Sequence, residues 1–224
     1  MRVLLSWSSG KDSAWALRLL RARADVEVVG LVTTFNGAAE RVAMHGVRRS
    51  LVEAQAERVG LPLWSYDLPA ACSNAQYEEV LGRVFARARG EGVDGVAFGD
   101  LFLSDIREYR ERQMEGSGLA AMFPVWGLPT GDLARAMIAA GVRAKLTCVD
   151  LARLDASYAG REFDLEILES LPTGVDACGE NGEFHTFVYE APWFREGIGV
   201  EVGALVVRDG FCFADLIGGE GLPL

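Results

Sequence analysis

Apolar runs rich in β-branched residues alternate with segments whose apolar residues recur at helical spacing over roughly the first 140 residues. The runs predict strands at 2–7, 26–35, 63–66, 93–99 and 120–125. The segments between them predict helices at 12–23, 45–59, 74–89, 104–114 and 131–140. Strands that alternate with helices form a parallel sheet covered by helices on both faces. The sequence therefore predicts an α/β fold.

The pattern changes near the end of the last of these helices. A strand is predicted at 143–149 and a helix at 162–171, followed by the polar turn "CGENGEF" and a strand at 184–189. Strand-like runs at 204–208 and 211–216 flank Asp209-Gly210, a dipeptide typical of two-residue hairpins. We therefore expect two domains, residues 1–130 and a smaller α+β domain of residues 131–224.

Composition narrows the class of protein. The formal net charge is −10, which argues against a broad electrostatic grip on nucleic acid. No apolar run approaches the roughly 18 residues of a membrane helix, and the N-terminus does not resemble a secretory signal. We therefore expect a cytoplasmic protein without membrane contact. The four cysteines are widely separated and form no C-x-x-C, so we expect buried free thiols rather than a metal or redox site.

The first strand runs directly into "SWSSGKDSAWAL" at Ser6–Leu17. This is not a Walker A loop or a dinucleotide-binding loop, because the glycines those loops need are missing. A helix N-terminus beside Lys11 nevertheless favours a phosphate. The serines add hydroxyl donors, and Asp12 suits a Mg²⁺ ion next to the phosphates. The simpler alternative is an ordinary helix cap with a solvated lysine.

The stretch Ser8–Ser13 resembles the PP-loop, S-G-G-K-D-S, of the N-type ATP pyrophosphatases, with Ser9 at the first glycine position. In that superfamily the loop binds the β- and γ-phosphates of ATP, and the enzyme releases pyrophosphate and leaves adenylate on a substrate. Because Ser9 carries a Cβ atom, we expect its φ angle to be negative.

Three further segments, Met44–Leu63, Gly95–Glu111 and Asp176–Val188, are similar to the diphthine–ammonia ligase family. The late G-E-x-G-E-[FY] pattern is the most specific part of this resemblance. The resemblance implies a Rossmann-like ATP domain and a small C-terminal domain facing its cleft. It also implies that ATP and Mg²⁺ are used to convert a carboxylate into an amide with ammonia, releasing AMP and pyrophosphate.

The resemblance and the predicted strand ends together indicate the site residues. We expect ATP to contact Ser6, Ser8, Ser9, Gly10, Lys11, Asp12, Ser13, Thr33, Thr34, His45, Gly99 and Asp100. We expect the acceptor to contact Asp100, Arg107, Glu180, Asn181, Glu183 and His185. The expected catalytic residues are Lys11, Asp12, Glu180 and Glu183, with Asp12 holding the metal ion. The alternatives are a solvated turn at Gly179–Glu183, a solvated helix face at Arg107 and a surface position for His185.

The acceptor is not defined by the sequence. It is expected to be a small-molecule or protein-borne carboxylate, and the absence of an evident glutaminase segment suggests free ammonia or a separate donor as the nitrogen source. The preference for Arg over Lys suggests a bacterial source, in which diphthine should be absent. A tRNA-thiolating enzyme, an ATP pyrophosphatase without such an acceptor and a non-catalytic nucleotide sensor remain alternatives, and a homodimer is left open.

Overall fold

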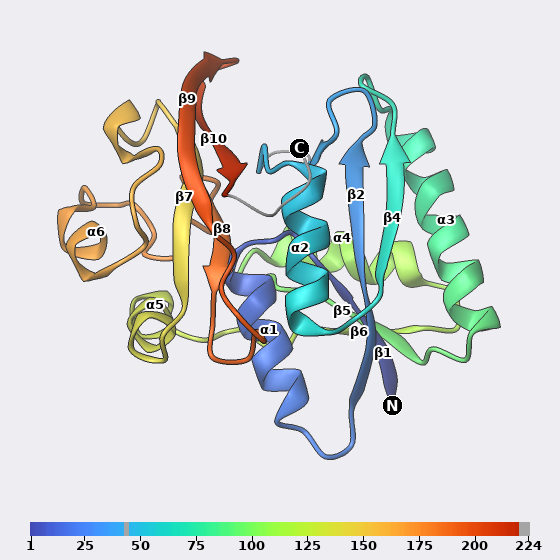
Figure 1. The fold of residues 1–224 in the computed structure, drawn as a ribbon. Coiled ribbons are helices and arrows are strands. Elements are labelled where there is room, and N and C mark those ends of the chain that lie inside the picture. Colours follow the sequence, from blue (N-terminus) through green and yellow to red (C-terminus); the bar gives the residue numbers. More distant parts are fainter. Residues whose placement is uncertain (43–44, 220–224) are drawn as a thin grey trace.

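The computed structural model describes residues 1–42 and 45–219. The described chain forms two sheets, one built before residue 123 and one after residue 142. Helices α1 (Lys11–Arg21) and α2 (Arg49–Val59) lie between the two sheets (Figure 1). The predicted boundary at residue 130 falls in the connection between the sheets, at the start of α5 (Thr130–Ala139).

The first sheet is the predicted parallel sheet with one antiparallel addition. Its order is β3-β2-β1-β5-β6, and β4 pairs with β2. All pairs are parallel except β2 with β3. The strands are β1 (Arg2–Ser6), β2 (Glu27–Asn36), β3 (Arg41–Val42), β4 (Leu63–Leu68), β5 (Gly95–Ala97) and β6 (Ala120–Met122).

The two faces of this sheet are covered by different elements. Helices α1 and α2 share a continuous apolar core with the second sheet, which includes Leu17, Leu51 and Phe187. A second cluster joins α3 (Asn74–Gly90) and the end of α4 (Ser104–Met114) to the opposite face. Helices on both faces of a largely parallel sheet confirm the predicted fold class. The carboxyl ends of β1, β2 and β5 consequently open between the two groups of helices.

The second sheet is antiparallel, with the order β8-β7-β10-β9. Its strands are β7 (Arg143–Asp150), β8 (Phe184–Glu190), β9 (Val200–Arg208) and β10 (Phe211–Gly218). Asp209 and Gly210 join β9 to β10 and both have positive φ angles, as the predicted hairpin turn requires. A short 3₁₀ turn, Ala156–Tyr158, and helix α6 (Leu165–Ser170) lie between β7 and β8.

Several predicted boundaries are wrong. The helix expected from His45 begins only at Arg49, because Gly46 has a φ of +67° and turns the chain out of a helical path; Met44, where the quoted segment starts, lies outside the described residues. Helix α6 is shorter than predicted because Asp164 caps it by accepting a hydrogen bond from Ile167 N. Cys72 is only half-buried, whereas the other three cysteines are buried free thiols as expected.

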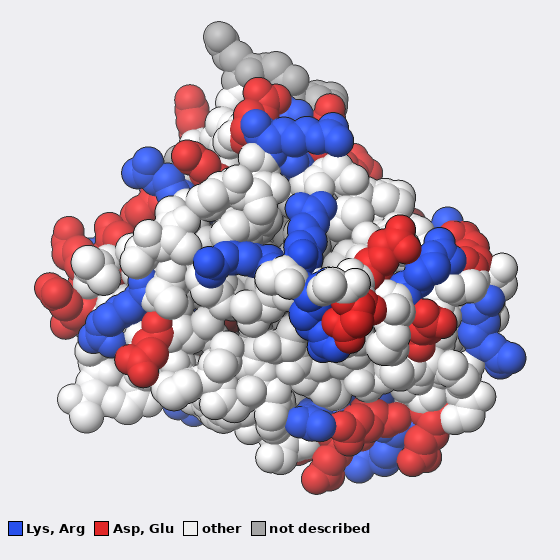
Figure 2. Space-filling view, turned by 90° about the horizontal axis from the view of Figure 1, so that it is seen from below, with Lys and Arg blue, Asp and Glu red and all other residues white. Residues whose placement is uncertain are grey.

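Charge is distributed in small groups on the surface. On the face seen from below, acidic and basic side chains lie interspersed among uncharged ones (Figure 2). Many charged side chains of the molecule form local ion pairs, such as Arg23–Asp25 and Arg87–Glu91. Among the described residues, no helix combines the length and the apolar character needed to cross a membrane.

Candidate active site

A cavity of about 540 Å³ lies where the carboxyl ends of β1, β2 and β5 meet the start of β8. One wall is formed by the loop after β1 and the start of α1, and another by α3 and α4. The turn before β8 closes the third side with Cys178, Gly179 and Glu180. The topology therefore brings together the PP-loop-like segment and the late glycine-rich turn, which are more than 160 residues apart in the chain.

Ser9 adopts a φ of +71°, so the expectation of a negative φ is wrong. The reason is that its carbonyl oxygen is held from two sides. It accepts hydrogen bonds from Val188 N and from Nε2 of Gln55, each at 3.0 Å. These bonds tie the loop to β8 and α2 and impose a left-handed conformation that normally favours glycine. Ser9 is fully buried, and its hydroxyl has no hydrogen-bond partner among the described residues.

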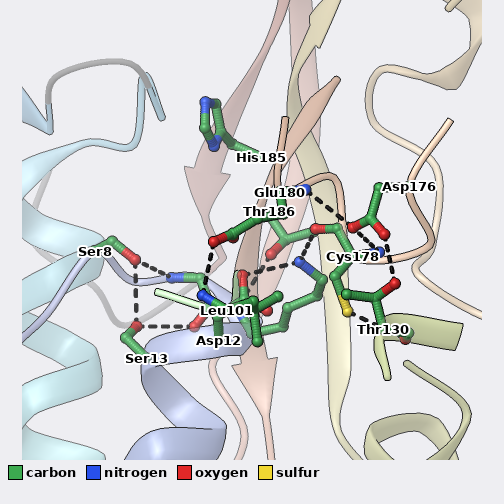
Figure 3. A network of polar contacts seen from close by, with 12 residues as sticks. Ser8, Asp12, Ser13, Leu101, Thr130, Asp176, Cys178, Glu180, His185 and Thr186 are labelled. Atoms are coloured by element: carbon green, nitrogen blue, oxygen red, sulfur yellow. Dashed lines mark hydrogen bonds and ion pairs between the residues drawn. The ribbon is translucent and has the colours of Figure 1, made fainter. Parts of the chain in front are cut away.

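The rest of the loop is held close to the start of α1 and to β8 by hydrogen bonds. Ser13 Oγ donates to Gly10 O at 2.9 Å, and Lys11 N donates to Thr186 Oγ1 at 3.1 Å. Ser8, Asp12, Ser13 and Thr186 all belong to the polar network drawn in Figure 3. An added Cβ at Gly10 would lie 3.2 Å from Thr186 O, so the packing against β8 leaves little room for a side chain.

Lys11 is buried, and its ammonium group already has partners. Nζ donates to the carbonyl of Cys178 and to Asp12 Oδ2, the latter at 2.9 Å. The rings of Phe163 and Phe184 lie 5.5 and 5.3 Å from it. Burial lowers the pKa of Lys11, but Asp12 and other nearby groups more than offset this, and the net pKa is raised. Lys11 therefore links α1 to the turn before β8, and its contact with a phosphate stays a prediction.

Asp12 lies at the cavity wall with one carboxylate oxygen unpaired. Oδ2 accepts from Lys11, whereas Oδ1 is buried and has no partner among the described residues. Burial raises the pKa of Asp12, and the neighbouring Lys11 opposes that shift. Among the residues that the structure describes, no group of three or more His, Cys, Asp or Glu side chains could hold a metal. One free carboxylate oxygen fits a Mg²⁺ ion whose other ligands are substrate phosphates and waters.

Glu180 is the carboxylate of the late turn that reaches the cavity. Its Oε1 accepts hydrogen bonds from Leu101 N at 2.7 Å and from Phe102 N at 3.4 Å. Burial raises its pKa to about 7, although these backbone bonds act in the opposite direction. A carboxyl group that titrates near neutral pH can both accept and return a proton during a reaction.

Glu183 and Asn181 differ from the expectation that they face the acceptor. Neither is among the residues that line the cavity. The Glu183 carboxylate is fully buried and accepts from Asp176 N and Asn181 N, and from the Asn181 side-chain amide. These bonds close the turn, so the second glutamate of the motif organises the backbone that presents Glu180.

Other predicted residues separate into two groups. Ser6, Thr33, Thr34, Gly99 and Asp100 line the cavity. Arg107 does not, because its guanidinium pairs with Glu111 at 2.9 Å and stacks on Phe123 and Trp126. Ser9 and Gly10 also lie behind the cavity wall rather than on it.

Sequence reasoning missed two buried polar residues that set the loop geometry. Gln55 bridges the two sheets, since its side chain donates to Ser9 O and Val188 O and accepts from Trp7 Nε1. Its position between Leu51 and Val59, on the apolar face of α2, is a signal that could have identified it. Thr186 lies one residue beyond His185 and gave no signal of its own.

Both parts of the chain match models of known protein families. The family model for the diphthamide synthase N-terminal domain matches residues 1–121, and that for the diphthamide synthase C-terminal domain matches residues 129–213. The chain is similar to proteins named diphthine–ammonia ligase. It is 26% identical to the rat (Rattus norvegicus) protein and 25% identical to the human (Homo sapiens) protein, over 96% of this chain and 88% of each relative. It is 28% identical to the zebrafish (Danio rerio) protein, over 96% of this chain and 92% of that relative.

Proposed function

Because the chain belongs to the diphthamide synthase family, we propose that it is an ATP-dependent ligase that converts a carboxylate into an amide with ammonia. The observation that carries the proposal is one cavity that joins a phosphate-type loop at the start of α1 to Glu180 on the facing turn. The loop is proposed to bind the phosphates of ATP. Glu180, whose pKa is about 7, is proposed to accept the proton that the attacking nitrogen loses.

The phosphates of ATP are proposed to lie at the N-terminus of α1. Backbone N–H groups and the helix dipole favour an anion there. The hydroxyls of Ser8 and Ser13 lie on the cavity wall, where they donate to Ser13 Oγ and Gly10 O and are proposed to turn toward the phosphates when ATP binds. Thr33 and Thr34, which line the cavity in the second half of β2, are proposed to contact the nucleoside. Asp12 would hold Mg²⁺ through its unpartnered Oδ1, and a bound Mg²⁺ would neutralise charge on the departing pyrophosphate.

In the first step, an oxygen of the acceptor carboxylate attacks the α-phosphorus of ATP. A bond from carboxylate oxygen to phosphorus forms, the bond between the α-phosphorus and the bridging oxygen breaks, and pyrophosphate leaves with that electron pair. The α1 N-terminus stabilises the developing negative charge because its N–H groups are oriented before the reaction begins. Asp100, on the wall next to the loop, is proposed to orient the acceptor.

In the second step, ammonia attacks the acyl carbon of the adenylate and AMP leaves. The nitrogen becomes positively charged as the C–N bond forms and must lose a proton before the amide is stable. Glu180 is proposed to take this proton, since its carboxylate faces the cavity and is held by Leu101 N. Glu183 is proposed to act indirectly, as a positioning residue that fixes the turn carrying Glu180.

The acceptor is identified here only as a carboxylate. The curated relatives are named for diphthine and ammonia, so diphthine is the first acceptor to test. Other protein-borne and small-molecule carboxylates follow, with ammonium as the nitrogen source.

The test is to identify the products formed from labelled ATP with Mg²⁺, ammonium and a panel of carboxylates. The proposal expects AMP and pyrophosphate in equal amounts, together with an amide that incorporates ¹⁵N from ammonium. Glu180→Gln is the matched control and should bind ATP but form little amide. ADP and phosphate as the main products would contradict the mechanism.

A further inference from the structure

The only two histidines of the chain lie against each other in the cavity wall. His45 precedes α2, and His185 is the second residue of β8. Their ring centroids are 4.3 Å apart, the planes are inclined by 31°, and both residues line the cavity. Two segments separated by 140 positions thus supply one imidazole each to the same place.

This histidine pair covers the phosphate-type loop. An added Cβ at Gly10 would lie 3.4 Å from Cε1 of His45. His45 lines the cavity and Gly10 does not, so the imidazole stands between the loop glycine and the cavity. Figure 3 draws His185 above the hydrogen-bonded network, with no interaction to the other residues shown. A group bound at the N-terminus of α1 would therefore meet these rings.

The pair has unused hydrogen-bonding capacity. Nδ1 of His45 is buried and has no partner among the described residues. Buried polar atoms of this kind are nearly always satisfied, either by the protein or by something bound to it. Among the described residues, no third His, Cys, Asp or Glu side chain joins the pair to form a metal site, and the nearby Lys11 ammonium disfavours a cation. An anionic group is the better match.

The surroundings of the two imidazoles favour their neutral forms. Burial and, to a smaller extent, Lys11 lower the pKa of His185 to about 4. Burial, His185 and Lys11 lower the pKa of His45 well below its usual value, whereas the Thr186 backbone opposes that shift. The other ionisable groups on the cavity wall are Asp12, Tyr77, Asp100, Arg110, Cys178 and Glu180. Arg41 and Arg48 pair with Asp215 where the His45 segment meets β10.

We propose that His45 and His185 together bind the terminal phosphate of ATP and take up one shared proton from solvent as it binds. This inference rests on the proposed function, because it needs ATP with its phosphates at the start of α1. A phosphate within hydrogen-bond reach favours the charged form of a histidine by roughly 1–3 pKa units. Two rings whose centroids are 4.3 Å apart cannot both hold that charge, so the pair titrates as a unit.

The shared proton follows the phosphates through the reaction. The proton stabilises the triphosphate and then the pyrophosphate product, and it returns to solvent when pyrophosphate leaves. AMP lacks the β- and γ-phosphates and should bind without proton uptake. The pair would therefore distinguish ATP from AMP in the same cavity.

The experiment is titration calorimetry with α,β-methylene-ATP and Mg²⁺, since this analogue cannot be cleaved between the α- and β-phosphates. Repeating the titration in buffers of different ionisation enthalpy gives the number of protons taken up. Wild type is expected to take up a proton with the analogue and none with AMP. Its affinity should rise by up to about ten-fold between pH 8 and pH 6, the upper value corresponding to a histidine pKa that is raised from about 4 in the free protein to about 7 in the complex.

Two variants separate proton binding from packing. His185→Phe keeps a ring in the stack, and His45→Gln keeps a hydrogen-bond donor. Each should bind the analogue with less than about two-fold dependence on pH over the same range. Because the chain has only two histidines, ¹⁵N spectra of histidine-labelled protein should show one pair of imidazoles change toward the protonated pattern when the analogue binds.

The outcomes distinguish this inference from the proposed function. Binding of the analogue without proton uptake, together with unchanged imidazole signals, would overturn the role of the histidines and leave the ATP site intact. A wild-type protein that binds neither the analogue nor ATP would overturn both. Equal proton uptake with AMP would show that the pair does not respond to the terminal phosphate of ATP, which would overturn the inference.

Discussion

The loop after β1 and the turn before β8 carry the two strongest motifs of the sequence, and the structure uses them differently. In the loop, Asp12 has a carboxylate oxygen that is buried and unpaired. In the turn, nearly every polar group is used internally: Asp176 accepts from Cys178 N and Glu180 N, and Glu183 accepts three hydrogen bonds. The loop is thus prepared for a ligand, while the turn is mainly a rigid support for Glu180.

Each motif also contains one buried charge whose partners lie within the protein. Lys11 connects the start of α1 to the Cys178 carbonyl, and Glu183 closes its own turn. A charged residue within a functional motif is therefore not by itself evidence of contact with substrate. Burial and existing partners decide the matter, and substitutions can test the distinction.

The largest expected effect is that of Glu180→Gln on amide formation. Removing a general base typically lowers a rate by about 10²–10⁴-fold, and the remaining carbonyl oxygen of Gln can still accept from Leu101 N. In wild type the base acts when deprotonated, so turnover at a fixed ammonia concentration should rise with pH through about 7. The variant should lose this rise, and its melting temperature should change little. Unchanged turnover with the rise retained would remove Glu180 from the mechanism.

Lys11→Met should act mainly on stability. The substitution preserves length but leaves the half-buried Asp12 carboxylate and the Cys178 carbonyl without their partner. Breaking a buried ion pair on one side typically costs about 3–5 kcal/mol. Denaturant unfolding measures the loss. The double variant Lys11→Met/Asp12→Asn should recover part of it, and no recovery would indicate that the pair is not the source of the effect.

Glu183→Gln should produce a smaller loss of stability than the lysine variant. The side-chain amide would present a donor where donors from Asp176, Asn181 and the Asn181 side chain already point. Hydrogen bonds to a charged acceptor contribute about 1.5–3 kcal/mol. The measurement is the melting temperature of Glu183→Gln, with Glu180→Gln as the matched control. A stable Glu183→Gln protein that lacks turnover would instead restore the expectation that Glu183 acts on the acceptor.

Much of the fold could be predicted because its signals are local. The apolar runs and helical spacings identify the strands and helices of the parallel sheet, and Asp209-Gly210 identifies the last hairpin. The two-residue strand β3 is too short to give a pattern. The start of α2 could not be predicted, because the positive φ angle of Gly46 keeps the preceding residues out of the helix. Such conformations depend on contacts that the sequence pattern does not record.

The site residues could be predicted only in part, because their roles also depend on contacts that form in the folded protein. Motif resemblance indicated Asp12 and Glu180, which reach the cavity, but it assigned Glu183 and Arg107 to the acceptor as well. Whether a carboxylate faces a cavity depends on which backbone N–H groups surround it, as they surround Glu183. Gln55 was missed because its role arises from two segments, the loop and β8, that meet only in the folded protein.

The smallest expected effect concerns Ser9, at the position where the family pattern has glycine. The left-handed conformation costs a serine about 1 kcal/mol or more, and its buried hydroxyl has no partner. Ser9→Gly should remove both penalties, offset in part by the greater freedom of glycine in the unfolded chain. The net result should be a gain of about 1 kcal/mol in unfolding free energy. Ser9→Ala, which retains the strained Cβ, is the control and should gain less.

Because Ser9 is not on the cavity wall, Ser9→Gly should leave ATP affinity within about two-fold of wild type, whereas loss of a direct hydrogen bond would cost about 0.5–1.5 kcal/mol. Calorimetry and unfolding of the same samples measure both quantities. Weaker ATP binding by both variants would mean that the hydroxyl turns toward the phosphates when ATP binds. Loss of stability in Ser9→Gly would mean that the hydroxyl, and not the backbone alone, supports the loop.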